Sequence, residues 1–144
     1  FRRNTLHYFR KVGTGQSGTW TGPITLDTLA SSSNSQRVNS ASIIASRTSP
    51  KVAVVYTVPS AQGLIQQQRY DNDIWYTESD SVGASWGARI NVTNYQRNVA
   101  SFTANLGAFG LYDTQGFLHI LYRAQPVDAN PYATTSSFFW GAFS

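Results

Sequence analysis

Residues 74–90 read IWYTESDSVGASWGARI, and this stretch decides the fold because the chain contains an earlier counterpart of it. The counterpart begins at residues 6–10 (LHYFR), passes through a Gly-rich loop and ends at residues 18–24 (GTWTGPI). Each copy has an aromatic run, a small polar turn, a Gly-x-[Ser/Thr]-Trp motif and an Ile four residues after the Trp. The tryptophans, Trp20 and Trp86, lie 66 residues apart. The chain therefore contains an internal repeat, which is the first pattern to look for in a sequence.

Two further matches follow in the same order along the chain. Gln36-Arg37 precedes VNSASI as Gln96-Arg97 precedes NVASF, and residues 52–57 (VAVVYT) correspond to residues 118–123 (LHILYR). A third copy begins at residues 137–140 (SFFW). The spacing is 66 residues for the tyrosines of the second match but 60 for the Gln-Arg pairs, so loop lengths differ between the copies.

The repeat predicts β-structure. Short β-branched and aromatic runs are separated by clusters of Gly, Pro, Asn, Asp and Ser, and the alternation in residues 52–57 and 118–123 predicts strands with one buried face. No segment has a clean helical period, and residues 26–35 (LDTLASSSNS) are expected to form a loop. We expect four strands in each repeat. In the fuller copy they lie near Ala100–Leu106, Leu118–Tyr122, Ile74–Glu78 and Arg89–Val92.

Tandem four-stranded antiparallel units describe a β-propeller. The predicted fold class is therefore all-β, a β-propeller segment that occupies residues 1–144. It would comprise the end of one blade, about two blade repeats and the start of another, with no separate second domain. Two blades cannot close a ring, so we expect the remaining blades from missing sequence, the preferred source, or from another chain.

The composition excludes several other classes. Among 144 residues, 41% are hydrophobic and 12% are charged, with a net charge of +4, which is unlike a disordered tail or a coiled coil. No apolar run is long enough for a membrane-spanning helix. Without Cys, disulfides and thiolate metal sites are excluded. The nine Arg are scattered rather than clustered, so a nucleic-acid partner is not expected.

Residues 79–86 (SDSVGASW) resemble the Asp-box, Ser-x-Asp-x-Gly-x-Thr-Trp, of sialidase-like (BNR-repeat) propellers. The matching or near-matching positions in the two copies are Ser79, Gly83, Ser85 and Trp86, and Gly18, Thr19 and Trp20. Ser81 stands where the family has its Asp, and the earlier copy has lost the acidic position. The resemblance implies an Asp-box-like hairpin between the third and fourth strands of a blade, on the side opposite the ligand face.

The expected role of these motif residues is structural. Gly supplies a positive φ, the side-chain oxygens of the Ser and Asp residues bond nearby backbone N–H groups and hold the turn, and the Trp inserts between neighbouring blades and buries a large area.

The resemblance also indicates where a ligand would bind. The second-to-third strand connections are long in both copies, at residues 58–72 and 124–136, and long loops are uncommon unless functional or disordered. The candidate ligand residues there are Gln67, Arg69, Tyr70, Asp128 and Tyr132. Planar amides, aromatics and charges suit sugar hydroxyls or peptide groups. The alternative, which we prefer on balance, is a loop that packs on its neighbour.

Arg37 and Arg97 are repeat-equivalent in the alignment. Sialidases hold the substrate carboxylate with three Arg, because a guanidinium matches a carboxylate in bidentate fashion. Hydrogen bonds between blades are the preferred alternative for these two residues. The family also implies a Tyr nucleophile with a Glu base, but Glu78 is the sole Glu and adjoins the Asp-box-like turn. A complete glycosidase site is therefore not expected within this stretch.

No cofactor is predicted. His7 and His119 lie in different strand types without a third ligand at a recognisable spacing, so zinc is not expected. Residues 71–73 (DND) could offer oxygens to Ca²⁺, but a turn that initiates a strand is the preferred interpretation.

The leading functional prediction is a non-catalytic propeller module that binds glycans or proteins through these loops. The alternatives are a fragment of a sialidase-like exo-glycosidase and a structural component of a surface assembly. Ser and Thr supply 31 residues and Cys none, which is typical of an exported protein, so an extracellular, periplasmic or cell-surface location is expected. The chain lacks Met and opens with Phe1, which suggests a processed chain or a piece of a longer one.

Overall fold

The computed structural model describes residues 4–29, 38, 40–59, 72–93, 102–127 and 139–143. These residues form nine β-strands and one short 3-10 turn, η1 (Gly15–Ser17), with no α-helix among them. The expectation of an all-β protein with antiparallel sheets is therefore confirmed.

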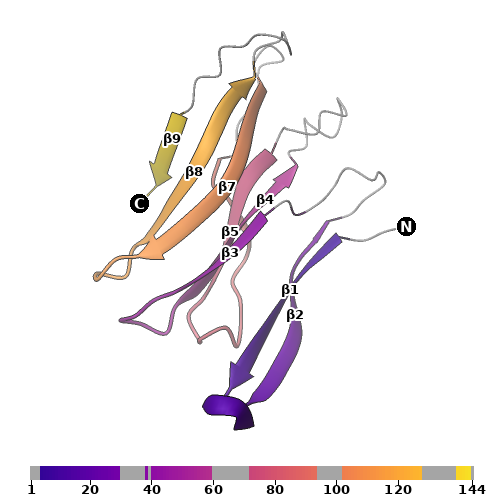
Figure 1. The fold of residues 1–144 in the computed structure, drawn as a ribbon, viewed down its shortest axis with the longest axis vertical. Helices are drawn as coiled ribbons and strands as arrows, with labels where there is room; N and C mark the ends of the chain where they lie inside the picture. Colours follow the sequence, from indigo (N-terminus) through magenta and orange to yellow (C-terminus); the bar gives the residue numbers. More distant parts are fainter. Residues whose placement is uncertain are drawn as a thin grey trace.

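The strands form three units in chain order (Figure 1). The first unit is the antiparallel pair β1 (Asn4–Val12) and β2 (Thr19–Leu29). The second unit is antiparallel throughout and contains β3 (Ser40–Ala45), β4 (Val52–Pro59), β5 (Asn72–Ser79) and β6 (Ile90–Asn91). The third unit contains β7 (Phe102–Tyr112), β8 (Leu118–Val127) and β9 (Phe139–Phe143). One parallel bridge, between Asn72 and Ala104, joins the second unit to the third.

The strand expectations need two corrections. The strand expected at Ala100–Leu106 extends to Tyr112, because Gly107 adopts a φ of +62° at an irregularity in the ladder and pairing continues beyond it. The strand at Ile74–Glu78 pairs antiparallel with β4, which precedes it, and the strand at Arg89–Val92 pairs with β5, so both belong to the unit that precedes β7 and β8 in the chain. The second unit, β3 to β6, is thus the four-stranded antiparallel unit. No sheet closes on itself among the described residues.

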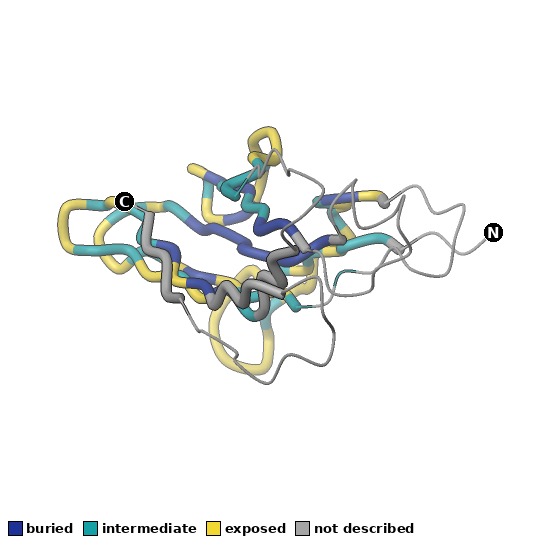
Figure 2. The backbone as a smooth tube through the Cα atoms, turned by 90° about the horizontal axis from the view of Figure 1, so that it is seen from above, coloured by how far each residue is buried: buried dark blue, intermediate teal, exposed yellow. Residues whose placement is uncertain are grey.

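Strand β4 is buried on both faces, whereas the alternation of its residues predicted one buried face. Ala53 and Val55 belong to a cluster shared by the second and third units. Val54 and Tyr56 belong to a cluster with side chains of the first unit. The polar Thr57 is equally buried, because the strand lies in the middle of the molecule. Figure 2 shows the buried residues gathered in this central region, with exposed turns at the edges.

The three units therefore stack face to face. The cluster between the second and third units comprises Ile44, Ala53, Val55, Ile74, Ala108, Ile120 and Tyr122. The cluster between the first and second comprises Val54, Tyr56 and Val58, with Leu6, Leu26, Val38, Trp75 and Trp86 packed against it. We call the side of a unit that points to the earlier unit its preceding face and the other side its following face.

The ladder register shows that the repeat in the sequence is a repeat in space. Tyr56 lies opposite Ala41 in the second unit, and Tyr122 lies opposite Ala108 in the third. Both tyrosines are buried on the preceding face of their unit. Residues that are 66 apart on β4 and β8 therefore occupy equivalent positions.

The two ends of the stack differ in their connections. The tight turns at residues 13–18, 46–51, 80–89 and 113–117 lie at one end, the lower end in Figure 1, which we call the turn end. The strands at the other end lead into the connections β2–β3, β4–β5, β6–β7 and β8–β9.

Candidate functional site

The predicted ligand residues belong, by their positions in the sequence, to the four connections β2–β3, β4–β5, β6–β7 and β8–β9. Arg37 belongs to the β2–β3 connection and Arg97 to the β6–β7 connection. Gln67, Arg69 and Tyr70 belong to β4–β5, and Asp128 and Tyr132 to β8–β9. All seven lie outside the described residues. The described strands that flank these connections have the corresponding ends on the side of the stack opposite the turn end (Figure 1).

The strand register bears on the comparison of Arg37 with Arg97. In the sequence, Arg37 lies four residues before Ala41, the residue opposite Tyr56. Arg97 lies eleven residues before Ala108, the residue opposite Tyr122. Counted along the sequence, the two arginines therefore stand at different distances from equivalent strand positions, so the Gln-Arg alignment differs from the alignment given by the ladders.

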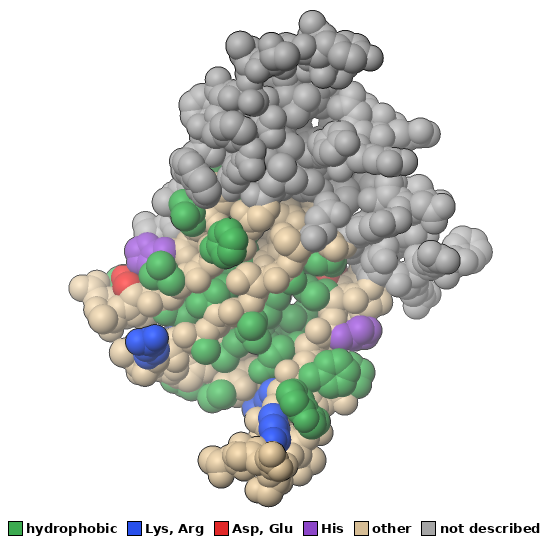
Figure 3. Space-filling view, in the orientation of Figure 1, with side chains coloured by type: hydrophobic (Ala, Val, Ile, Leu, Met, Phe, Trp, Pro, Cys, Tyr) green, Lys and Arg blue, Asp and Glu red, His purple; other side chains and the backbone are tan. Residues whose placement is uncertain are grey.

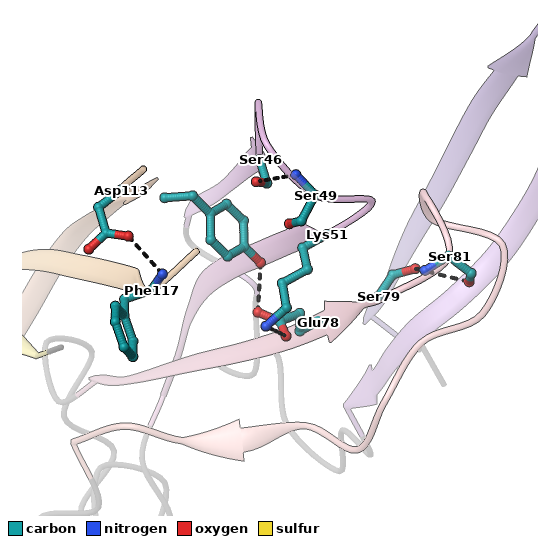
Figure 4. A network of polar contacts seen from close by, with 9 residues as sticks. Ser46, Ser49, Lys51, Glu78, Ser79, Ser81, Asp113 and Phe117 are labelled. Atoms are coloured by element: carbon teal, nitrogen blue, oxygen red, sulfur yellow. Dashed lines mark hydrogen bonds and ion pairs between the residues drawn. The ribbon is translucent and has the colours of Figure 1, made fainter. Parts of the chain in front are cut away.

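The turn after β5 is held by serine hydroxyls (Figure 4). Ser79 Oγ accepts hydrogen bonds from the backbone N–H of Gly83 at 2.8 Å and of Ser81 at 3.2 Å. Ser81 Oγ accepts one from the backbone N–H of Ser85 at 3.0 Å. Gly83 has a φ of +78°, a conformation that costs other residues free energy. These contacts fix the conformation of the turn.

The two tryptophans of the repeat lie in different environments. Trp86 is half-buried beside the second unit's core, and its ring centroid lies 4.9 Å from that of Tyr8 in the first unit, at an interplanar angle of 70°. Trp20 lies in β2 opposite Lys11 and is 66% exposed. Gly18 and Thr19, which precede it, adjoin the β1–β2 turn. Insertion between units therefore describes Trp86, whereas the described residues leave Trp20 open to solvent.

A buried carboxylate joins the first unit to the second. Asp27 Oδ2 accepts a hydrogen bond of 3.0 Å from the Tyr56 hydroxyl, and Asp27 Oδ1 accepts one of 2.5 Å from Arg89 Nη1. The Arg89 guanidinium also lies 4.8 Å from the ring centroid of Trp75, a distance that allows a cation–π attraction. Burial, with Asp27 beside it, raises the pKa of Tyr56 well above its ordinary value. The Tyr56 hydroxyl is therefore held as a hydrogen-bond donor to Asp27.

A second carboxylate joins the second unit to the third (Figure 4). The Tyr112 hydroxyl donates a hydrogen bond of 2.6 Å to Glu78 Oε2, and Lys51 Nζ lies 3.3 Å from Glu78 Oε1. Burial, followed by the bond to Glu78, raises the pKa of Tyr112. This Tyr–Glu pair lies at the turn end and, like Asp27 with Tyr56, connects two neighbouring units by a hydrogen bond. We call each of these pairs a latch.

Asp73 lies at the beginning of β5, near the end opposite the turn end. Its Oδ2 accepts a hydrogen bond from Asn91 Nδ2 and its Oδ1 one from Thr93 Oγ1, both at 3.1 Å. Burial raises the pKa of Asp73. Asn72 and Asp73 begin strand β5, whereas Asp71 lies outside the described residues. No group of three His, Cys, Asp or Glu side chains suited to a metal ion occurs in the described part of the chain.

The turn end also carries an open hollow of about 560 Å³ between the β3–β4 and β7–β8 turns. Its lining includes Ile44, Arg47, Leu111 and Asp113. Asp113 Oδ2 lies 3.0 Å from His119 Nε2, and Asp113 Oδ1 accepts the backbone N–H groups of residues 115 and 117. The pKa of Asp113 is lowered, chiefly by the bond to His119. The Asp113 carboxylate is thus bonded to the backbone of its own turn and to His119 in β8.

The carboxylates of Asp27, Glu78 and Asp113 therefore hold parts of the fold together. A general acid requires a carboxyl group that faces a substrate, whereas Asp27, Glu78 and Asp113 are bonded within the chain. The two histidines lie far apart in the stack, His7 in β1 beside Thr25 and His119 in β8. They do not form a common metal site.

No local sequence motif marks these latches. The hydrogen-bond partners of Asp27, Arg89 and Tyr112 lie 29 to 62 residues away along the chain. One signal was available, since Asp27 interrupts the apolar pattern of residues 26–29 (LDTL) and a charge at a core position needs a partner.

Comparisons with known proteins give no relative for this chain. No family model matches it, no curated protein matches it, and no solved structure matches it. Among the described residues, no helix has the length and apolar character needed to cross a membrane.

Proposed function

We propose that this chain is a segment of a β-propeller from an exported or cell-surface protein. Its three units are successive blades of the kind found in sialidase-like propellers, and the connections opposite the turn end bind glycans or proteins. The observation that carries the proposal is the arrangement of the units. Each buries one face against its neighbour in chain order, as propeller blades do around their axis.

The composition of the connections supports a glycan ligand in particular. The β4–β5 connection supplies Gln67, Arg69 and Tyr70, and the β8–β9 connection supplies Asp128 and Tyr132. Aromatic faces with a few convergent polar groups are typical of small-molecule sites. At the turn end, by contrast, Glu78 and Asp113 are bonded within the chain. We therefore assign the ligand site to the opposite end. A binding function accounts for these residues better than an enzymatic one, because Glu78 and Asp113 are bonded within the chain.

A glycan array probed with the labelled 144-residue chain tests this function. We expect binding to a restricted set of oligosaccharides. Tyr70→Ala and Tyr132→Ala should each weaken it by about tenfold or more, a factor that corresponds to about 1.4 kcal/mol. Gln16→Ala is the matched control, since Gln16 is exposed in the turn between β1 and β2 and should leave binding unchanged.

Two results would redirect the proposal. If no oligosaccharide binds to chain whose circular dichroism is that of a folded β-protein, the glycan function is wrong. If a fluorogenic sialoside is hydrolysed, and Arg37→Ala and Arg97→Ala abolish the hydrolysis, the chain is part of an exo-glycosidase. Equal binding by Tyr70→Ala, Tyr132→Ala and the wild-type chain would remove these loops from the site.

A further inference from the structure

The hollow at the turn end lies between the second and third units. One wall comes from the end of β3 and the β3–β4 turn, and the other comes from the end of β7 and the β7–β8 turn. Its volume of about 560 Å³ falls within the range of small-molecule sites, about 300–1,000 Å³. Its lining combines polar side chains with the apolar residues Ile44, Ala45, Gly110 and Leu111. The hollow is therefore large enough for a small organic molecule that has an apolar part.

Two opposite charges line this hollow without forming an ion pair with each other. Arg47 lies in the β3–β4 turn and Asp113 in the β7–β8 turn. In the described part of the chain the Arg47 guanidinium has no hydrogen bond or ion pair, whereas Arg10 and Arg89 are bonded within the chain. Figure 3 shows a basic side chain over the β3–β4 turn and an acidic one over the β7–β8 turn, with uncharged atoms between them. The two walls thus offer a ligand a free guanidinium and a carboxylate.

The negative charge of Asp113 is not needed to hold its turn. Ser46 begins the β3–β4 turn as Asp113 begins the β7–β8 turn, and the backbone N–H of each closes its turn on a carbonyl, at 2.9 and 3.0 Å. Ser46 Oγ accepts the backbone N–H of Ser49 at 3.1 Å (Figure 4). Asp113 Oδ1 accepts that of Phe117 at 2.9 Å in the same way. A neutral hydroxyl therefore does for one turn what a carboxylate does for the other.

The Asp113 carboxylate retains capacity for a further donor. A carboxylate has about four acceptor positions. Two backbone N–H groups occupy Oδ1, and His119 Nε2 lies 3.0 Å from Oδ2, so one position at Oδ2 remains. The side chain is 31% exposed. The neighbouring charges Lys51 and Glu78 form an ion pair with each other, so Arg47 and Asp113 are the charges left for recognition.

We propose that this hollow binds a small zwitterion with an apolar side chain, such as a free aliphatic amino acid. The ligand's carboxylate lies against Arg47, because a guanidinium holds a carboxylate in bidentate fashion. Its ammonium donates to the remaining position of Asp113, and its side chain covers Ile44. A ligand with only one charge would leave either Arg47 or Asp113 unpaired. The site lies at the turn end, so it is separate from the proposed glycan site and adds a second binding activity.

An NMR titration of the 144-residue chain with three probes tests the proposal. The probes are leucine, isocaproate, which lacks the ammonium of leucine, and isoamylamine, which lacks its carboxylate. Leucine should shift the backbone resonances of the β3–β4 and β7–β8 turns. It should also bind about tenfold or more tightly than either analogue at neutral pH, since each analogue loses one bond between charged groups.

Two variants separate the contributions of the two charges. Arg47→Gln should weaken leucine binding about tenfold or more and leave isoamylamine binding unchanged, because that probe has no carboxylate. Asp113→Ser, which copies the cap that Ser46 provides, should weaken leucine binding by a similar factor and leave isocaproate binding unchanged. Arg10→Gln is the matched control. It makes the same chemical change in β1, where Arg10 contacts Thr21, and it should bind all three probes as the wild type does.

Three results would overturn the proposal. They are a leucine titration that shifts neither turn, equal binding of the three probes, and a variant that weakens all three probes alike, which would indicate a purely structural role for its side chain. Circular dichroism checks the fold of each variant. If Asp113→Ser fails to fold, Asp113→Asn makes the same test, since it keeps an acceptor oxygen for the turn. Glycan binding is measured on the same variants and should not change, so failure of this site leaves the proposed function intact.

Discussion

The side chain of Tyr8 fills the space beside Gly83 that any larger residue would need. A Cβ on Gly83 would lie 2.7 Å from Tyr8 Cζ, closer than carbon atoms approach without movement of the chain. The same tyrosine packs against Trp86, with 4.9 Å between the two ring centroids. One aromatic residue of the first unit is thus enclosed by the turn of the second. The turn at residues 79–86 therefore has two tasks, since it reverses the chain and forms part of the contact between units.

Gly83→Ala should destabilise the protein for both reasons. The positive φ alone costs a non-glycine residue about 1–3 kcal/mol, and the collision with Tyr8 adds to it. Gly116→Ala is the matched control, because Gly116 also has a positive φ, +89°, but nothing lies within 4 Å of its Cβ position. Urea unfolding gives the free energy of unfolding of each variant. Equal losses for the two would mean that the contact with Tyr8 contributes nothing.

Tyr56→Phe should weaken the latch between the first and second units. It removes the hydrogen bond to Asp27, and a bond to a charged group contributes about 1.5–3 kcal/mol. Tyr76→Phe is the control, since Tyr76 is partly buried on the neighbouring strand β5 and no hydrogen bond is shown for its hydroxyl in the described residues. The free energy of unfolding should fall for Tyr56→Phe and change little for Tyr76→Phe. A double-mutant cycle with Asp27→Asn should give a coupling energy of the same sign, and a coupling of zero would contradict the latch.

The strands could be predicted from the sequence because their signals are local. Alternating β-branched and aromatic residues mark β4 and β8, and both were located to within a few residues at their beginnings. The extent of β2 could not be predicted, because residues 22 and 23 (GP) signal a turn and yet β2 continues to Leu29. As an edge strand, β2 accommodates a proline that lacks the N–H of the ladder. The first residues of the stretch expected to form a loop, Leu26 to Leu29, accordingly belong to β2.

The contacts between units were beyond prediction from the sequence for a different reason. Asp27 and Arg89 are 62 residues apart, and they meet only because the two units stack. Periodicity identifies which face of a strand is apolar, but it does not say what covers that face. For the same reason the burial of β4 on both faces was missed, since only the stacked neighbours reveal it.

Alkaline pH should destabilise the protein through Tyr112. In the folded state burial and Glu78 raise the pKa of this hydroxyl above its ordinary value, while in the unfolded state it titrates near pH 10. Above about pH 10 the unfolded state therefore loses a proton that the folded state retains, so stability is fully present below that pH and falls as the pH rises. Tyr112→Phe should show a shallower decrease in the free energy of unfolding between about pH 9 and pH 11. An unchanged slope would mean that Tyr112 ionises equally in both states.

The bond between His119 and Asp113 should be visible in the acid titration of this carboxyl group. The pKa of Asp113 is lowered chiefly by His119 and further by the backbone N–H groups of residues 117 and 115. His119→Ala should therefore raise it toward the ordinary value of about 3.9, as followed by the carboxyl carbon shift in NMR. His7→Ala is the control, because His7 lies in β1 and contacts Thr25, and the Asp113 titration should not change.

Because the folded pKa is the lower one, the stability that Asp113 contributes is present above the unfolded pKa and is lost as the pH falls through the folded value. His119→Ala should accordingly reduce the acid dependence of unfolding below about pH 4, and a titration identical to that of the wild type would mean that the backbone alone holds the carboxylate.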